Sequence, residues 1–258
     1  GAGAACSADS CSVAVGAGRQ ALGGAAVATL MFATTRPPYA ERLNAAAISA
    51  ALDLPAQTRS LELGGNSRMG LAGLLLASEL GHAGRTTLVC ASDVVIGAPG
   101  GARGRDSGDA AVAFVTGAGD EAIARLLGSA SGTAEVLDVW RLPGDPFTRQ
   151  WEERFGIEIL GPVSVDTAKR ALINAGVEPV SLAKLVLDAT NRRSVADIPR
   201  APGLRSEQLA APLAYNPGRP VLAHAALWPA PVPAPAQPLA PLALLSTHSC
   251  SPPPLVLS

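Results

Sequence analysis

The stretch LELGGNSRMG, residues 61–70, continues into LAGLLLA at residues 71–77 and decides how this chain folds. A short apolar run breaks at two glycines, a hydroxyl side chain stands at the turn, and the chain restarts as an apolar helix. Ser67 therefore precedes a helix, where free backbone N–H groups and the positive end of the helix dipole stabilise an anion. Two interpretations are open: Ser67 is a nucleophile for acyl transfer, or Ser67 or Asn66 caps the helix.

The composition predicts a folded protein with a real core. Hydrophobic residues make up 48% of the 258 residues and charged residues 16%, which excludes a chain disordered throughout. The net charge of −1 does not predict binding to nucleic acid or to an anionic membrane, since both attract basic proteins. No apolar run approaches the roughly 20 residues that span a bilayer, and the first residues lack the pattern of a signal peptide. We expect a cytoplasmic protein.

The four cysteines show neither a CxxC pair nor a grouping with histidine at metal-ligand spacing; they are Cys6, Cys11, Cys90 and Cys250. We therefore expect no zinc site and no metal cofactor. Cys90 stands inside an apolar run of strand length, which favours a small core residue.

Apolar runs of strand length alternate with helical segments along the first half. Strands are expected at residues 27–33, 59–63, 85–91, 110–116 and near 135–140, and helices at 12–22, 44–52 and 70–80. Such alternation predicts βαβ units and a mostly parallel sheet covered on both faces.

A second cycle begins further along and then stops. A helix at 162–175, a strand at 182–187 and a weak helix at 193–201 look like the opening of a repeat of the first half. From residue 217 onward the chain carries 11 of its 22 prolines and one charged residue, Arg219. This composition is typical of an extended linker or a disordered end, and a frame shift in a GC-rich gene would also produce it. The expected organisation is 1–128, 129–216 and a poorly folded tail at 217–258.

Four segments, in this order, resemble motifs of the thiolase superfamily. They are ATTRPPYAER at 33–42, the turn unit at 61–74, DVWR at 138–141 followed by WEERF at 151–155, and VLDATNRR at 186–193. The chain is most similar to the branch of 3-hydroxy-3-methylglutaryl-CoA synthase and its bacterial relatives, and more distantly to ketoacyl-ACP synthase III. The resemblance implies an α/β fold of the thiolase type, layered αβαβα, with an incomplete second half.

The same resemblance places three altered residues in the catalytic positions. Ser67 stands at the position of the family's Cys, Thr35 at that of its acid/base Glu, and Asp188 at that of its His. A serine alkoxide is out of reach without a base, and a threonine cannot move a proton near neutral pH. We therefore expect a site whose architecture is kept and whose chemistry is impaired.

Several arginines are candidates for binding the phosphates of coenzyme A: Arg68, Arg192 and Arg193, with Arg36, Arg103 and Arg105. A guanidinium binds phosphate oxygens in a bidentate manner, and ordinary surface charge is the alternative.

The function implied by the resemblance is acyl-CoA acyl transfer or condensation, with acyl-CoA as substrate, no further cofactor, and a homodimer as the assembly. One alternative is a non-catalytic scaffold that binds acyl-CoA in a complex with a thiolase and an OB-fold protein. Another is a serine-dependent acyl hydrolase built on Ser67 and Asp188.

Overall fold

A computed structural model describes residues 8–101, 108–119, 122–189, 203–208, 242–247 and 255–257. The chain forms two compact units, residues 1–121 with 215–227 and residues 122–214 with 228–258. Among the helices of the described residues, none is long and apolar enough to cross a membrane.

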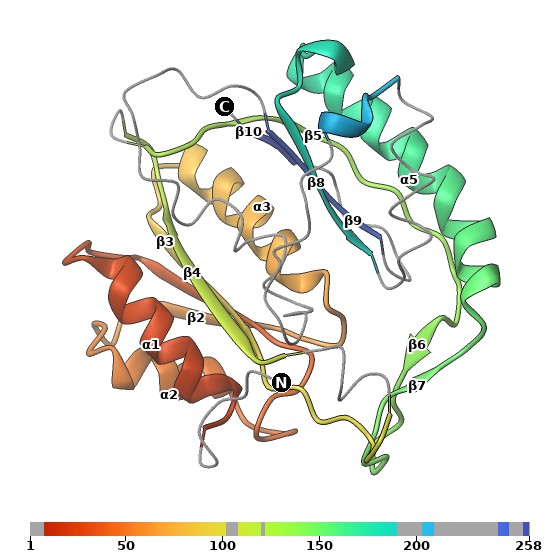
Figure 1. Ribbon diagram of the computed structural model, residues 1–258. Coiled ribbons are helices and arrows are strands. Elements are labelled where there is room, and N and C mark those ends of the chain that lie inside the picture. Colours follow the sequence, from red (N-terminus) through yellow and green to blue (C-terminus); the bar gives the residue numbers. More distant parts are fainter. Residues whose placement is uncertain are drawn as a thin grey trace. The chain divides into compact units, whose positions relative to one another are not determined.

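Within the described residues, the first unit contains a four-stranded sheet and three helices (Figure 1). Its elements are α1 (Ser10–Leu22), β1 (Thr29–Ala33), α2 (Asn44–Ala51), β2 (Arg59–Leu63), α3 (Met69–His82), β3 (Thr87–Asp93) and β4 (Ala110–Thr116). The strand order is β2-β1-β3-β4; β1 pairs with β2 and β3 in parallel, and β4 runs antiparallel to β3. The predicted strands and helices of this half are confirmed to within a few residues.

Helices cover both faces of this sheet, as the continuous apolar strands predicted. Leu30 and Phe32 of β1 pack with residues of α1 and α2, including Ala14 and Ile48. The intervening Met31 packs against α3 on the other face. Because successive side chains of a strand point to opposite faces, a strand buried on both sides must be apolar at every position. Figure 1 shows α1 and α2 on one side of the sheet and α3 on the other.

Helix α1 has well-defined ends. Asp9 and Ser12 form a capping box, in which the Asp9 carboxylate accepts from the Ser12 backbone N–H at 2.8 Å. The helix ends at Gly23, whose φ of +49° is a left-handed conformation that glycine adopts without steric cost. The paired glycines at 23–24 thus end the helix as the sequence predicted.

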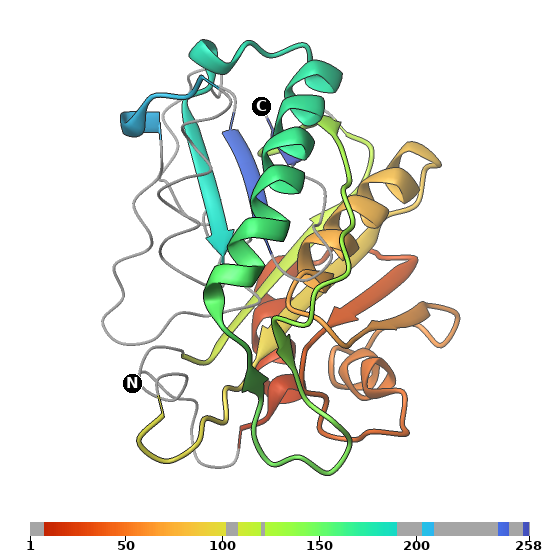
Figure 2. The same ribbon diagram turned by 90° about the vertical axis from the view of Figure 1, so that its right-hand side faces the viewer.

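In the part of the second unit that the structure describes, there is a four-stranded sheet, a hairpin and one long helix. Its elements are β5 (Leu126–Ser129), β6 (Val139–Trp140), β7 (Arg149–Gln150), α5 (Glu153–Ala175), β8 (Lys184–Ala189), β9 (Leu242–Thr247) and β10 (Leu255–Leu257), with short 3-10 turns η1 (Pro179–Ser181) and η3 (Ser206–Gln208). The strand order is β5-β10-β9-β8, and Figure 2 shows α5 lying along one face of this sheet. The core between them includes Ala171, Leu172 and Leu185.

Parts of this unit differ from the sequence-based predictions. The tail from residue 217 contributes β9 and β10, the two inner strands of the sheet, so the prediction of a poorly folded segment is wrong for 242–247 and 255–257. These apolar runs are only six and three residues long, and they stand in a proline-rich segment. The composition of that segment therefore did not predict strands. Residues 193–201, predicted as a weak helix, lie outside the described part of the chain.

Helix α5 begins nine residues before Pro162, the residue at which the sequence predicted its start, because Glu153 opens the helix and Pro162 lies inside it. Proline is favoured at the first turn of a helix, and that preference suggested the later start. The predicted strand near 135–140 is shorter than expected, since only Val139–Trp140 pairs, with Arg149–Gln150.

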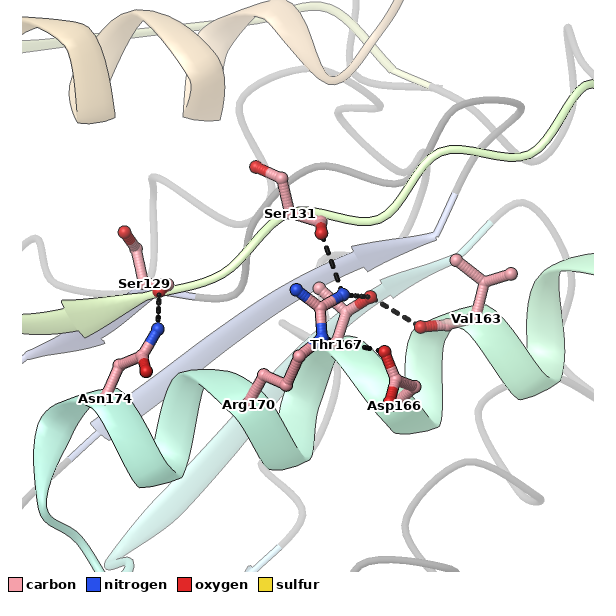
Figure 3. Close-up of polar contacts among 7 residues, drawn as sticks. All are labelled: Ser129, Ser131, Val163, Asp166, Thr167, Arg170 and Asn174. Atoms are coloured by element: carbon pink, nitrogen blue, oxygen red, sulfur yellow. Dashed lines mark hydrogen bonds and ion pairs between the residues drawn. The ribbon is translucent and has the colours of Figure 1, made fainter.

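Polar side chains of α5 bind the end of β5 and the segment that follows it (Figure 3). Arg170 donates to the carbonyl oxygen of Ser131 and Asn174 to that of Ser129, each at 2.8 Å. Arg170 also pairs with Asp166 one turn earlier at 2.8 Å. These bonds satisfy the backbone carbonyls of Ser129, the last residue of β5, and of Ser131 just beyond it.

Gly128 of β5 approaches α5 so closely that a side chain has no room. A Cβ atom there would lie 2.5 Å from the backbone nitrogen of Ala175. We expect Gly128→Ala to lower the free energy of unfolding of this unit by about 1–3 kcal/mol, because backbone cannot yield as a flexible side chain does. Urea unfolding followed by circular dichroism measures the change.

Gly156→Ala is the matched control, since a Cβ at this position in α5 would meet only Asp138 Cβ at 3.8 Å. Replacing glycine by alanine within a helix should raise stability by up to about 1 kcal/mol. Equal effects of the two substitutions would contradict the close approach of β5 and α5.

Candidate functional site

The carboxyl ends of β1, β2 and β3 share one edge of the first sheet. Ala33 is in register with Leu63 on one side and with Ala91 on the other. The backbone N–H of Thr34 donates to the carbonyl oxygen of Leu63 at 3.2 Å, which extends the pairing one residue beyond β1. Open α/β sheets bind ligands at this edge, where the turns after several strands meet. The candidate site is built from those turns.

Ser67 lies in the turn between β2 and α3 and does not cap the helix. The N-cap residue is Arg68, and no side chain makes a capping hydrogen bond there. Asn66 organises the turn instead: its side-chain Oδ1 accepts from the Arg68 N–H at 2.9 Å, and its carbonyl accepts from the Met69 N–H at 3.2 Å. Within the described ranges the half-buried Ser67 hydroxyl has no hydrogen-bond partner. The capping interpretation is therefore wrong for Ser67.

Thr35 is tied to Asp93, the last residue of β3. Asp93 is 3% exposed. Its Oδ2 accepts from the Thr35 hydroxyl at 2.9 Å, and its Oδ1 accepts from the Thr35 backbone N–H at 2.9 Å and from the Thr34 hydroxyl at 3.0 Å. Three donors to one buried carboxylate stabilise its charged form.

Buried hydroxyls extend this network to α1. The Ser10 hydroxyl donates to the Arg36 carbonyl oxygen at 3.1 Å, and the Ser92 hydroxyl donates to the Ser10 carbonyl oxygen at 2.6 Å. The Arg36 N–H donates to the Thr34 hydroxyl oxygen at 3.2 Å. The first turn of α1, the end of β3 and the loop after β1 are thereby fixed together.

A second carboxylate anchors the far end of that loop. Glu62 of β2 accepts from the Asn44 backbone N–H at 2.7 Å and from the Asn44 side-chain amide at 2.9 Å. The same amide donates to the carbonyls of Tyr39 and Arg42. An anion at the N-terminus of α2 satisfies a free N–H and complements the helix dipole. The loop 34–43 is thus fixed at both ends.

The structure brings some predicted site residues together and leaves others apart. Thr35, Ser67 and Arg68 follow neighbouring strands of the first sheet, and the Arg68 Nε is buried with no partner within the described part of the chain. Asp188 lies in β8 of the second unit, in register with Ser246. The arginines at 103, 105, 192 and 193 lie outside the described residues.

Asp93 is the functional candidate that sequence reasoning missed. The signal was present, since the apolar run TLVCA ends in Ser92 and Asp93 where a parallel strand reaches its carboxyl end. A strand-terminal carboxylate is a common turn residue, however, and only the pairing of β1 with β3 shows which residues it meets. In the described ranges, no three His, Cys, Asp or Glu side chains form a metal-binding group.

Neither described cysteine supplies a thiolate to this site. Burial, with a smaller contribution from Asp9, raises the pKa of Cys11 to about 11, and burial raises the pKa of Cys90 to about 12. The interpretation of Cys90 as a core residue is confirmed, because its side chain is fully buried.

We expect Cys11 and Cys90 to resist iodoacetamide at pH 8 in the folded protein, because the thiolate is the reactive form. Their labelling should rise about tenfold per pH unit toward pH 11, as the thiolate fraction does below the pKa. Peptide mass mapping reports each cysteine separately. Protein in guanidinium chloride is the control, in which both thiols react, and rapid labelling of either one at pH 8 in the native state would contradict their burial.

Comparison with known proteins identifies the architecture. No protein-family model matches the chain. The 3-oxoacyl-(acyl carrier protein) synthase III of Pseudomonas aeruginosa superposes with a TM-score of 0.78 at 20% identity, over 97% of this chain and 83% of that one. OleA of Xanthomonas campestris gives a TM-score of 0.78 at 15% identity, over 98% and 81%. The chain has the thiolase fold.

A third structure has the same fold. It is a cysteine-to-serine variant of Xanthomonas campestris OleA with bound lauric acid and lauroyl-CoA, which superposes with a TM-score of 0.76 at 14% identity over 98% of this chain and 83% of that one. That variant holds an acyl-CoA. At this level of identity the three similarities establish the fold alone. What chemistry the site can carry out has to be argued from the residues of this chain.

Proposed function

We propose that this protein is a homologue of the acyl-transferring condensing enzymes that binds acyl-CoA at the carboxyl edge of the first sheet. The observation that carries the proposal is the position of Ser67, in a turn that leads into α3 and with a hydroxyl that is not used as a cap. The fold shared with 3-oxoacyl synthases and OleA supports the same reading. More specifically, we propose that the reaction of its active relatives is a condensation of two acyl groups like that of 3-hydroxy-3-methylglutaryl-CoA synthase.

The N-terminus of α3 can stabilise the carbonyl oxygen of a thioester. Helix α3 has 14 residues and starts without a side-chain cap. Its first N–H, that of Met69, donates to the Asn66 carbonyl, and the N–H groups that follow in the first turn point toward the turn that carries Ser67. Such N–H groups and the helix dipole stabilise negative charge on a carbonyl oxygen. Arg68, together with Arg192 and Arg193, is proposed to bind the phosphates of coenzyme A.

The residues also argue that turnover is impaired. A serine hydroxyl needs an adjacent base to become a nucleophile, and within the described ranges no basic group hydrogen-bonds to Ser67. Thr35 replaces the family's acid/base, and Asp93 already accepts the proton of its hydroxyl. We therefore infer acyl-CoA binding with slow acylation or none.

The test is acylation of the turn by acetyl-CoA, followed by intact-mass measurement. Ser67→Cys should gain the mass of one acetyl group within minutes at pH 8, because a helix N-terminus lowers the pKa of a thiol enough to give thiolate. The wild type should acquire this adduct at least about a hundredfold more slowly, since a hydroxyl without a base stays protonated. Ser67→Ala is the matched control and should gain no adduct while still binding acetyl-CoA.

The alternatives make different predictions in the same assay. A serine hydrolase would release free coenzyme A from the wild type, and this release would be lost in Ser67→Ala. A non-catalytic scaffold that binds acyl-CoA would give no adduct in Ser67→Cys and would still bind acetyl-CoA. A protein without an acyl-CoA site would not bind acetyl-CoA in any variant. That last result would overturn the proposal.

We also propose that the protein forms a homodimer through the first sheet. Strand β2 is an outer strand, paired on one side with β1, and its first residue, Arg59, is exposed. An unpaired strand edge presents free N–H and C=O groups to another chain. Sedimentation equilibrium should give twice the mass of the chain at micromolar concentration, and the mass of a single chain would contradict this assembly.

A further inference from the structure

The turn between β2 and α3 is closed twice by one residue, Asn66. Its side-chain Oδ1 accepts from the Arg68 N–H at 2.9 Å, and its backbone carbonyl accepts from the Met69 N–H at 3.2 Å. The first bond closes an Asx-turn and the second a β-turn, and Ser67 lies inside both. The backbone that carries Ser67 is therefore fixed by the residue that precedes it.

These two bonds use half of the N–H groups that α3 cannot satisfy internally. The bond that joins the helix to its N-cap runs from the Ala72 N–H to the Arg68 carbonyl at 3.0 Å. The four preceding N–H groups, those of residues 68–71, have no acceptor within the helix. Asn66 accepts from the first two of the four, which leaves the second two for another acceptor.

A serine before a helix ordinarily caps it. An N-cap side chain accepts from the N–H two or three residues later, which for Ser67 is that of Met69 or Gly70. The Met69 N–H donates to Asn66 instead, and Arg68, with φ −70° and ψ −15°, stands at the N-cap position. Within the part of the chain that the structure describes, the Ser67 hydroxyl has no hydrogen-bond partner. Asn66 thus binds an N–H group that Ser67 would otherwise bind as a cap.

We propose that Asn66 is a positioning residue, which keeps the side chain at position 67 from capping α3 and so leaves it available for acylation. This inference rests on the proposed function, in which residue 67 receives the acyl group. Acylation forms a bond between the side-chain oxygen or sulfur and the acyl carbonyl carbon, and it breaks the bond from that carbon to the sulfur of coenzyme A. The side chain gives up its proton, and the released coenzyme A thiolate takes one up.

Ser67→Cys gives this position a thiol whose pKa can be measured, and Asn66 is changed in that background. Alkylation by iodoacetamide between about pH 5 and pH 10, followed by mass mapping of the peptide that carries residue 67, gives the pKa and the rate at high pH. In Asn66→Ala the pKa of the introduced thiol should fall by about one unit, because the released turn lets the thiolate cap α3. The rate at high pH should fall about threefold, since a thiolate of lower pKa is a weaker nucleophile.

Asn66→Asp is the conservative variant, which keeps the acceptor. A carboxylate oxygen accepts from the Arg68 N–H as the amide oxygen does, so the rate at high pH should stay within about twofold of that with Asn66. The added negative charge should raise the pKa of the introduced thiol by about half a unit to one unit. The charged residues of the neighbouring turns and strand ends, Arg36, Arg68 and Asp93, are the same in every variant.

Asn174→Ala is the matched control. It removes one asparagine hydrogen bond of the second unit, from the Asn174 side chain to the Ser129 carbonyl at 2.8 Å, and should leave the pKa of the introduced thiol unchanged. A merely structural role of Asn66 predicts the opposite shift in Asn66→Ala. The turn would then loosen, and the pKa would rise toward about 8.5, the value of an ordinary thiol.

Acetylation by acetyl-CoA, followed by intact mass at a pH above the pKa of each variant, links this role to the reaction. Asn66→Ala should acylate at least about threefold more slowly and Asn66→Asp should keep the rate, with the dissociation constant of acetyl-CoA unchanged. A thiol pKa that is unchanged or raised in Asn66→Ala would overturn the positioning role. The expected pKa values without acetylation of any variant would support that role and overturn the proposed function, because iodoacetamide needs no acyl-CoA site.

Discussion

Strand β1 is paired on both sides in a single register, and this constraint organises the site. Ala33 meets Leu63 of β2 and Ala91 of β3, so the chain leaves three strands at one edge of the sheet. The turns after β1 and β2 carry Thr35 and Ser67, and Asp93 is the last residue of β3. Because parallel strands end at the same edge, these residues lie at one edge of the sheet although they are far apart in the sequence.

The buried carboxylate of Asp93 is the electrostatic centre of this edge. A buried charge costs several kcal/mol unless hydrogen bonds replace the lost water, and Asp93 receives three from Thr34 and Thr35 alone. The arrangement fixes the loop after β1 and also determines which atoms that loop presents. This structural carboxylate thereby accepts the hydrogen of the neighbouring Thr35 hydroxyl.

The chemistry of the turn separates binding from catalysis. The start of α3 offers the N–H groups and the dipole that a thioester oxygen needs, and these depend on the backbone rather than on the side chain at position 67. Nucleophilic attack depends on that side chain and on its base. In the function that we propose, serine at this position keeps the first function and weakens the second, so the fold and the reaction need separate tests.

The sequence by itself determined the elements of the first unit and the position of Ser67 before a helix, because apolar periodicity and paired glycines are local signals. It did not reveal β9 and β10, whose short apolar runs stand between prolines and become strands only by pairing with β5 and β8. Nor did it reveal Asp93 as the partner of Thr35, since 58 residues separate them. Only the tertiary structure decided these pairings, because hydrogen bonds between distant segments depend on strand order and register, which no local pattern encodes.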